Sequence, residues 1–473
     1  MNSYEIRSIG SNKGAPRVWL EGHQPLRAGF APGTRYKAEI NAEKHLLVLE
    51  VVENGLRVVS GKKSKNGDKD IPVIDLNSKE LLGMFEGLDA VRVIVQTGKI
   101  FILPVASQLR AKERIATLKA KLEKGEVLST GSVSTGIGVL DLAAHKGLEH
   151  AGVSAKLAFA NEIREDCMDH AASVNPLFDD DTVSLTAPMQ ELAFDEYAMG
   201  KLPKVDLFVA GIPCSGASVA GRTKRKLEHP EAHPEVGHLV VPFLAIVAKT
   251  NPAVVVLENV PPYRNSASMD IIRNMLRDLG YVLHETELDA AEWNMLEHRK
   301  RMCMVAVTKG MEFSFDDVVK PEPAQATFGD IMDQVDPDHS TWGSIDYLWA
   351  KQERDQADGK GFAPTVVDSS SVKVPTLNKT LHKRQSTGTF IRHPEKHNLY
   401  RIPTVAEHAR CKGVPEALVA NTTQTFGHEV LGQSISVPPF VSVFEAIGRM
   451  LKRFGDSSES INTNFAMPER MAA

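Results

Sequence analysis

The sequence contains little cysteine and no long apolar run. Only four cysteines occur among its 473 residues, at positions 167, 214, 303 and 411, and no two of them have the spacing of a metal-binding pair. So few cysteines are typical of a protein from a reducing cytosol. The pattern predicts that the thiols are free and that no cysteine binds a metal ion. No apolar stretch approaches the roughly 18 residues that span a membrane, and residues 1–10 lack the apolar core of a secretory signal. We therefore expect a cytoplasmic protein with no membrane segment.

An excess of positive charge is also missing. The 55 Lys and Arg residues are outnumbered by 60 Asp and Glu, which gives a formal net charge of −5. A protein of this balance that binds nucleic acid must concentrate its basic residues locally. Two such concentrations exist, Arg222–Lys226 and the stretch from Lys373 to Arg392. Because a charge run is usually only a solvated face, its position in the fold decides whether it binds anything.

The first 127 residues predict a β-rich domain followed by a helix. Three short runs, Val48–Val52, Val91–Val95 and Ile100–Leu103, are typical of strands and are separated by turn signals. We assign 1–105 to this N-terminal domain. From 106 to 127 the chain is charged and carries apolar residues on one helical stripe, which predicts an amphipathic linker helix.

Beyond residue 127 the chain alternates between apolar strands and amphipathic helices. The strand candidates are Leu157–Ala160, Leu207–Ala210, Val254–Leu257 and Met302–Ala306. Continuous apolar strands that alternate with helices predict an α/β fold with a parallel sheet covered on both faces. In such a sheet ligands bind beyond the carboxyl ends of the strands. Functional residues should therefore follow the strands directly.

The predicted α/β domain covers 128–308, and residues 401–455 return to it. The intervening segment, 309–400, is less regular and rich in Asp, Ser, Lys, Pro and His. The tail, 456–473, is polar and predicts little ordered structure.

A glycine-containing turn follows the first strand of this α/β domain. The sequence Ser134-Thr-Gly-Ile-Gly138 runs directly into a predicted helix, whose free N-terminal amides can bind a ligand. Glu162 ends the next strand, where a carboxylate can accept hydrogen bonds from ribose hydroxyls. Both features suit any adenosine-containing cofactor, NAD included, although the third glycine of the dinucleotide fingerprint is missing.

Three further strand ends carry reactive side chains. Cys214 follows Pro213 in a Gly/Ser-rich turn, Glu258 ends a strand, and Arg299 and Arg301 mark the beginning of another. Taken singly, a buried cysteine is usually inert packing, and an arginine at a strand start is more often a surface charge. A carboxylate at a strand end should be partly desolvated, which raises its proton affinity toward that of a general acid.

Together the order and spacing of these motifs resemble the cytosine-5 methyltransferase family. The segment from Thr341 to Ala350 further resembles the members carried by bacteria, plasmids and phages. The resemblance covers the chain from about 130 to 450 and implies a Rossmann-like, S-adenosylmethionine-dependent domain, with 309–400 as a small target-recognition region. The segment Gly432-Gln-Ser-Ile-Ser-Val-Pro438 is similar to the final motif of the family. The penultimate motif is similar to a set formed by Arg401, Thr404, Glu407, Arg410, Gly413 and Pro415.

The resemblance implies a covalent mechanism on cytosine. Cys214 would add as a thiolate to carbon 6 of the ring, and Glu258 would hold or protonate ring nitrogen 3. Arg301 would bind the carbonyl oxygen, with Arg299 supporting the site. The cofactor, S-adenosylmethionine, would be bound by Thr135, Gly136, Ile137, Gly138, Glu162, Ile163, Asp181, Pro213, Gln433 and Ser434.

The same resemblance implies double-stranded DNA as the partner. The base is out of reach inside a duplex and must flip out. The basic segment just past Cys214 lies where the family has a mobile loop that closes on DNA, which favours phosphate binding. The expected DNA contacts are Ser218, Arg222, Lys224, Arg225, Lys226, Lys383 and Arg384. A cognate restriction endonuclease is a further expected partner, and the DNA-bound protein would be associated with the nucleoid.

The N-terminal domain carries a separate resemblance. Arg17–Gly22 and Leu26–Phe30 are similar to the small swapped-hairpin barrels of the SymE and AbrB type, several of which bind DNA. A structural or dimerising β-domain is at least as consistent with these residues. The sequence therefore leaves the role of this domain open between DNA binding and dimerisation.

Several positions depart from the pattern of the family and put cofactor affinity and DNA contacts in doubt. They are Ser134, Val139, Ser215, Ala217, Leu296, Glu297, where glutamine is usual, and Gln433. None of them removes the thiol, the acid or the arginine. Three alternatives stay open: an RNA (tRNA) cytosine-5 methyltransferase, a non-catalytic DNA-binding regulator on a methyltransferase fold and, more distantly, an NAD oxidoreductase.

Overall fold

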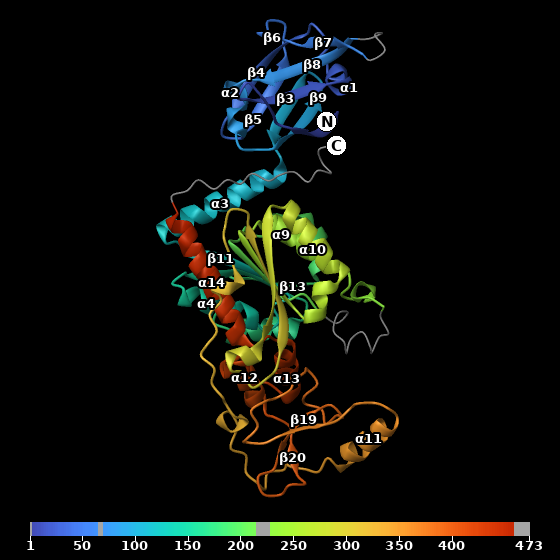
Figure 1. Ribbon diagram of the computed structural model, residues 1–473, viewed down its shortest axis with the longest axis vertical. Coiled ribbons are helices and arrows are strands. Elements are labelled where there is room, and N and C mark those ends of the chain that lie inside the picture. Colours follow the sequence, from blue (N-terminus) through green and yellow to red (C-terminus); the bar gives the residue numbers. More distant parts are fainter. Residues whose placement is uncertain (1, 65–69, 214–227, 458–473) are drawn as a thin grey trace. The chain divides into compact units, whose positions relative to one another are not determined.

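The computed structural model describes residues 2–64, 70–213 and 228–457 (Figure 1). The chain divides into two compact units, and each is considered by itself. Among these residues, the N-terminal unit comprises 2–116 with 278–280, and the large unit comprises 117–277 with 281–457. The segment predicted as a linker helix contains α3 (Ala106–Lys124), and the boundary between the units falls within this helix.

The N-terminal unit consists of two antiparallel sheets around an apolar core. The six-stranded sheet has the order β1 (Ser3–Ser8), β9 (Ala90–Gln96), β10 (Lys99–Pro104), β5 (Leu46–Val51), β4 (Arg35–Asn41) and β6 (Arg57–Val58). The four-stranded sheet has the order β2 (Gly10–Asn12), β3 (Ala15–Glu21), β8 (Asp70–Asn77) and β7 (Ser60–Lys63). Buried residues of both sheets, such as Val18, Leu47 and Ile74, form one cluster. The three strand-like runs of the sequence fall in β5, β9 and β10.

The large unit is built on a seven-stranded sheet. In spatial order its strands are β13 (Val183–Thr186), β12 (Ala155–Glu162), β11 (Leu128–Val133), β14 (Leu207–Ala210), β15 (Val254–Asn259), β17 (Lys300–Thr308) and β16 (Tyr281–Asp289). The first five strands are parallel. The strand order reverses at β11, because β12 lies on one side of it and β14 on the other. Such a reversal opens a crevice at the carboxyl ends of the strands.

The direction of β17 corrects the prediction of a parallel sheet. β17 is antiparallel to both of its neighbours, because β16 and β17 form a hairpin that reverses the chain. The amino end of β17 consequently lies beside the carboxyl end of β15, with Glu258 opposite Cys303 and Asn259 opposite Met302. This register brings Arg301 to the same sheet edge as Glu258.

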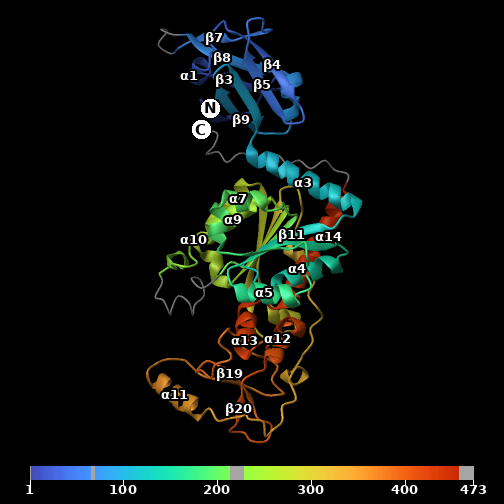
Figure 2. The ribbon, with the colours of Figure 1, turned by 180° about the vertical axis from the view of Figure 1, so that it is seen from behind.

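Helices cover both faces of the sheet (Figures 1 and 2). α4 (Val139–His150) and α14 (Val437–Asp456) lie together on one side, whereas α9 (Val240–Thr250) and α10 (Ala267–Asp278) lie on the other. The shorter helices α5 (Glu165–Val174), α6 (Met189–Phe194) and α7 (Glu196–Lys201) occur between β12 and β14. α4 and α14 approach closely at glycines, since a Cβ at Gly147 would lie only 2.4 Å from the carbonyl oxygen of Val441.

Residues 309–400 form a smaller lobe of the large unit. It contains α11 (Asp346–Ala357) and a sheet of β18 (Thr365–Val367), β19 (Thr389–Arg392) and β20 (Tyr400–Arg401), the last strand ending just past the lobe. Its core residues Phe328, Val367 and Ile391 pack with Leu296 and Cys411 from outside the lobe. α12 (Val405–Lys412) and α13 (Gln424–Gln433) then lead back to α14. The lobe is therefore packed onto the residues that precede β17.

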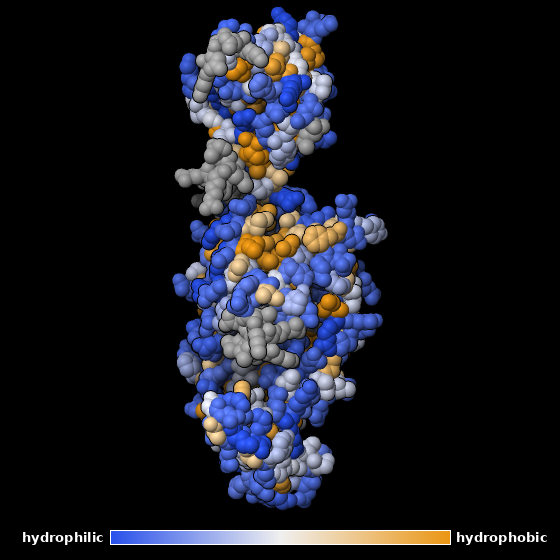
Figure 3. All heavy atoms as spheres, turned by 90° about the vertical axis from the view of Figure 1, so that its right-hand side faces the viewer, coloured by the Kyte–Doolittle hydropathy of each residue, from blue (hydrophilic) through white to orange (hydrophobic). Residues whose placement is uncertain are grey.

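The described ranges hold neither a single helix that could span a membrane nor a cluster of metal-ligating side chains. No single helix in the described ranges is long and apolar enough to cross a membrane. Taken together, α13 and α14 have the length and composition of a membrane span, but the pair is bent. No group of three His, Cys, Asp or Glu within residues 2–64, 70–213 and 228–457 could hold a metal ion. The face drawn in Figure 3 is mostly hydrophilic, with apolar residues gathered in a few patches.

Candidate active site

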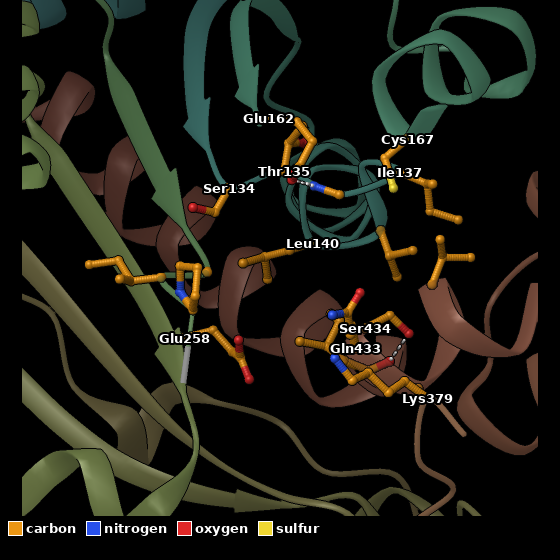
Figure 4. Close-up of a pocket in the computed structure, with 18 of the residues that line it drawn as sticks. Ser134, Thr135, Ile137, Leu140, Glu162, Cys167, Glu258, Lys379, Gln433 and Ser434 are labelled. Atoms are coloured by element: carbon orange, nitrogen blue, oxygen red, sulfur yellow. Dashed lines mark hydrogen bonds between the residues drawn. The ribbon is translucent and has the colours of Figure 1, made fainter. Parts of the chain in front are cut away.

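A cavity of about 580 Å³ opens in the large unit at the carboxyl ends of β11, β12, β14 and β15 (Figure 4). This volume is typical of a small-molecule site. Figure 4 shows Glu162 and Thr135 on one side of the cavity and Gln433 and Lys379 on another, with Glu258 facing the same space. The topology of the sheet therefore brings residues from the beginning and from the end of the large unit's sequence to the same cavity.

The turn between β11 and α4 places backbone amides at the cavity. Ser134 and Gly136 have left-handed φ angles of 54° and 59°, and Gly138, the N-cap of α4, has a φ of 77°. A Cβ at Gly138 would lie 2.4 Å from Nδ2 of Asn175, which donates to the carbonyl of Ile137 at 3.0 Å. Gly138 therefore shapes the turn. The predicted cofactor residues of this turn that line the cavity are Thr135, Gly136 and Ile137.

Glu162 ends β12 and is only 9% exposed. Its Oε2 accepts a hydrogen bond from the amide of Gly136 at 2.9 Å, and its Oε1 accepts one from the amide of Arg164 at 3.0 Å. Both bonds hold the carboxylate beside the cavity. Ile163, which also lines the cavity, is 63% exposed and offers an apolar surface next to it. A carboxylate at this strand end fits a ribose, and the apolar neighbour fits an adenine ring.

The end of β15 carries an ion pair between Glu258 and Arg301. Nε of Arg301 lies 2.7 Å from Oε1 of Glu258, and both side chains are largely buried. Burial raises the pKa of Glu258, while the positive charges of Arg301 and Arg299 oppose that rise. This direction agrees with the sequence prediction of a desolvated carboxylate. An acid with a raised pKa can hold a proton for a bound base.

Arg299 belongs to a buried charged network. Its Nη2 donates to the carbonyl of Gly432 at 3.0 Å, and its Nη1 lies 3.5 Å from Oε1 of Glu297. Nζ of Lys412 lies 2.9 and 2.7 Å from the two oxygens of Glu297, and the Glu297 and Lys412 side chains are both wholly buried. Burial lowers the pKa of Lys412 to about 7, and the positive charge of Arg299 adds to this effect. The acid at 297, a departure from the family, is thus compensated inside the fold by a lysine.

The turn after β14 leads to the predicted nucleophile. Pro213 lines the cavity, and the side-chain amide of Asn259 donates to the carbonyl of Ile212 at 3.1 Å, which ties this turn to the end of β15. Cys214 itself lies outside the described residues. So do the predicted DNA contacts Ser218, Arg222, Lys224, Arg225 and Lys226.

The other three cysteines are poor candidates for a nucleophile. Cys167, Cys303 and Cys411 are all buried. Burial raises the pKa of Cys167 to about 12, and it raises the pKa values of Cys303 and Cys411 as well. Because the thiolate is the reactive species, a thiol with a high pKa is inert at neutral pH. The assignment of the nucleophile to Cys214 stays a prediction.

The prediction for Asp181 is corrected. Asp181 is exposed and precedes β13, so it lies at the amino end of a parallel strand, whereas the cavity lies at the carboxyl ends. Its carboxylate lies 3.7 Å from the amine of Lys156, and it is not among the described residues that line the cavity. The predicted cofactor residues Gln433 and Ser434 do line the cavity, at the end of α13.

Lys383 and Arg384 lie in the smaller lobe and are not among the described residues that line the cavity. Lys383 is exposed. The guanidinium of Arg384 donates to the carbonyl of Thr341 at 2.9 Å and to that of Ser344 at 3.3 Å. Arg384 thus holds a loop of the lobe together. The DNA contacts expected of both residues stay predictions.

Among the polar cavity residues that the sequence analysis did not predict are Asp141, Thr376 and Asn378, and Lys379, part of the basic stretch from Lys373, lines the cavity beside the last two. The segment that contains the last three pairs with the residues before β17. The amide of His298 donates to the carbonyl of Val374 at 2.9 Å, and the hydroxyl of Thr376 donates to the carbonyl of His298 at 2.7 Å. In the sequence only the basic stretch from Lys373 pointed to this segment, and nothing pointed to Asp141.

The strand order, the glycine turn after β11 and the acid that ends β12 are those of a Rossmann-like domain whose sheet carries one antiparallel strand, β17. Solved structures have the same fold. The Dnmt2 methyltransferase of S. pombe matches 69% of this chain and 99% of its own with a TM-score of 0.52 at 21% sequence identity. At this identity the likeness shows the fold alone.

Comparison of the sequence places the chain in a narrower group than the fold does. The profile of C-5 cytosine-specific DNA methylases matches residues 130–449, and the chain belongs to this family. The Type II methyltransferase M.MspI of Moraxella sp is 29% identical over 267 residues, which cover 55% of this chain and 60% of the relative. M1.ScrFI of Lactococcus lactis subsp. cremoris is 26% identical over 261 residues, covering 53% and 64%. The chain thus spans less than two thirds of the length of these two relatives.

Proposed function

We propose that the protein is a DNA (cytosine-5-)-methyltransferase that uses Cys214 and S-adenosylmethionine. The observation that carries the proposal is the Glu258–Arg301 pair, at 2.7 Å, beside a cavity that Glu162 also lines. An acid with a raised pKa next to a guanidinium can bind nitrogen 3 and the carbonyl oxygen of a cytosine together. Membership of the cytosine-specific family supports the same reaction.

The residues around the cavity fit S-adenosylmethionine, which is a cation with a ribose diol. Glu162 is held where a carboxylate can accept hydrogen bonds from ribose hydroxyls. A Cβ placed at Gly136 would have no atom within 4 Å, so a ligand can approach the backbone there. Asp141 adds a second buried carboxylate at the same cavity. When bound, the cofactor supplies an electrophilic methyl group.

Cys214 and the described residues can together activate a cytosine. The sulfur of Cys214 forms a bond to carbon 6, and the electrons of the 5,6 double bond shift onto carbon 5 and the ring as Glu258 holds or protonates nitrogen 3. Arg301 binds the carbonyl oxygen and keeps Glu258 in place. After methylation, loss of the carbon 5 proton to solvent restores the double bond and expels the Cys214 thiolate.

The proposed substrate is a cytosine flipped out of duplex DNA. Flanking bases must be recognised away from the cavity, because phosphate contacts position a protein whereas base edges specify the sequence. The lobe at 309–400 is the proposed target-recognition region, with Lys383 exposed on it. The resemblance to the family also supports a cognate restriction endonuclease as a partner and a cytoplasmic, nucleoid-associated location.

Labelled S-adenosylmethionine with duplex DNA or tRNA as acceptor tests this function, followed by bisulfite sequencing of DNA from expressing cells. We expect methylated cytosine in one sequence context of DNA, and none with the Cys214→Ala variant. Methylation of tRNA alone would favour an RNA enzyme. Incorporation into neither acceptor, with cofactor binding intact, would indicate a non-catalytic regulator. Methylation by Cys214→Ala would disprove the nucleophile assignment.

A further inference from the structure

Asp141 is a buried acid at the cavity that the mechanism above does not use. It lies in the first turn of α4 and is only 1% exposed. The hydroxyl of Thr135 donates to its Oδ2 at 2.5 Å. Its other oxygen, Oδ1, is also buried and accepts no hydrogen bond from any residue that the structure describes. The carboxylate is therefore anchored on one side and unsatisfied on the other.

An unsatisfied buried carboxylate oxygen is costly and calls for a partner. Leaving such a group without a donor costs about 1–3 kcal/mol, and more when it is charged. Burial also raises the pKa of Asp141, an effect that the neighbouring hydroxyls of Thr135 and Ser132 oppose. A cationic donor in the cavity would both satisfy Oδ1 and stabilise the charge.

None of the described cationic groups that line the cavity, Arg164, Arg299, Arg301 and Lys379, donates a hydrogen bond to Oδ1 of Asp141. Arg301 pairs with Glu258 at 2.7 Å. Arg164 pairs with Asp166 at 2.6 Å and with Glu429 at 3.0 Å. The hydrogen-bond donor that Oδ1 lacks would therefore come from a bound ligand.

We propose that Asp141 binds the α-ammonium group of the amino-acid part of S-adenosylmethionine. This inference rests on the proposed function and deepens it. The ammonium is the group that matches, because it combines a positive charge with N–H donors, whereas the sulfonium has charge but no donor. The ribose hydroxyls have donors but no charge, and Glu162 already serves them from the end of β12.

Isothermal titration of the full-length protein with three ligands tests the inference without relying on turnover. S-adenosylmethionine carries both the sulfonium and the ammonium, S-adenosylhomocysteine keeps only the ammonium, and 5′-methylthioadenosine has neither. In Asp141→Asn the side chain keeps its size and an oxygen for Thr135 but loses its charge. We expect about 10- to 100-fold weaker binding of the first two ligands, as for a lost charge-assisted hydrogen bond, and unchanged binding of the third.

Glu149→Gln is the matched control, because Glu149 is an exposed acid near the other end of the same helix. It removes the same charge and should change none of the three affinities. Equal loss of all three ligands in Asp141→Asn would mean that Asp141 only supports the turn. A loss confined to S-adenosylmethionine would assign it to the sulfonium. If Asp141→Asn binds all three ligands as tightly as the wild type, the partner of Oδ1 would be a water molecule. Each of these outcomes overturns the inference.

The same titration separates this inference from the proposed function. If the wild-type protein binds no S-adenosylmethionine, both are wrong. If the wild type binds it and Asp141→Asn binds it equally well, the methyltransferase proposal stands and the inference alone fails. A thermal unfolding curve for Asp141→Asn checks that the variant is folded, and Asp141→Ser provides a second uncharged variant with the same expected ligand pattern.

Discussion

Lys412→Met should destabilise the protein although Lys412 touches no substrate. The amine lies 2.7 and 2.9 Å from the two oxygens of Glu297, and both side chains are wholly buried. Removing one partner of such a pair leaves an uncompensated buried charge, which costs about 3–5 kcal/mol of unfolding free energy. Glu297 would keep the amide of Leu377 at 2.8 Å and the guanidinium of Arg299 at 3.5 Å. We therefore expect a loss near the lower end, about 3 kcal/mol.

A second substitution should restore most of this stability. In Lys412→Met/Glu297→Gln both charges of the pair are gone, the glutamine oxygen can still accept from Leu377, and Arg299 keeps its bond to the carbonyl of Gly432. We expect the double variant to unfold within about 1 kcal/mol of the wild type, because replacing a whole buried pair is often neutral. Urea unfolding followed by tryptophan fluorescence measures this, since three of the four tryptophans, Trp293, Trp342 and Trp349, lie in the large unit.

The exposed pair of Lys396 and Asp338, at 2.8 Å, supplies the control. Lys396→Met should leave the free energy of unfolding nearly unchanged, as is usual for exposed ion pairs. If Lys412→Met is as stable as the wild type, or if the double variant is less stable than Lys412→Met, the account of a coupled buried pair is refuted.

Glu162→Ala should weaken S-adenosylmethionine binding, since each charge-assisted hydrogen bond lost contributes about 1.5–3 kcal/mol; an unchanged calorimetric dissociation constant would place the ribose elsewhere. A chain that starts near Lys112 should methylate the same sequence but bind DNA more weakly, because it loses the exposed lysines of β7. Arg384→Ala should relax or change the methylated sequence, and deep sequencing of methylated sites compares these two variants. A new motif in the truncated chain with an unchanged one in Arg384→Ala would reverse the assignment. Raising the pH from 7 to 9 should stabilise the wild type relative to Lys412→Met. The folded pKa of Lys412 is about 7 and the unfolded value is about 10.4, so unfolding takes up a proton in this window. A relative stability that falls with pH, in paired urea titrations, would contradict this sign.

The sequence predicts those parts of the fold that depend on local pattern. Apolar runs correspond to strands such as β12, β14 and β15, because a buried parallel strand needs little more than continuous β-branched and aliphatic residues. The strand ends then fix Glu162 and Glu258 at one sheet edge, since parallel strands share their carboxyl ends. The edge strand β13 is short and partly exposed, and its pattern is too weak to predict.

Features that depend on long-range contacts could not be predicted. Lys412 and Glu297 are 115 residues apart, and in the sequence each is simply a charged residue in a polar segment. The antiparallel direction of β17 follows from a hairpin whose two strands resemble any others in composition. The position of Asp181 depends on where β13 begins, because an acid before a strand and an acid after it lie at opposite edges of the sheet.

Trapping with 5-fluorocytosine tests most directly the central claim, that Cys214 adds covalently to a cytosine in DNA. Duplex DNA that carries this base at the methylated position is incubated with the full-length protein and S-adenosylmethionine. Fluorine at carbon 5 cannot leave as a proton does, so the adduct should persist. We predict a protein–DNA adduct that peptide mass spectrometry assigns to Cys214 and that Cys214→Ala does not form. A missing adduct on DNA that the protein methylates, or an adduct on Cys167, Cys303 or Cys411, would contradict the account.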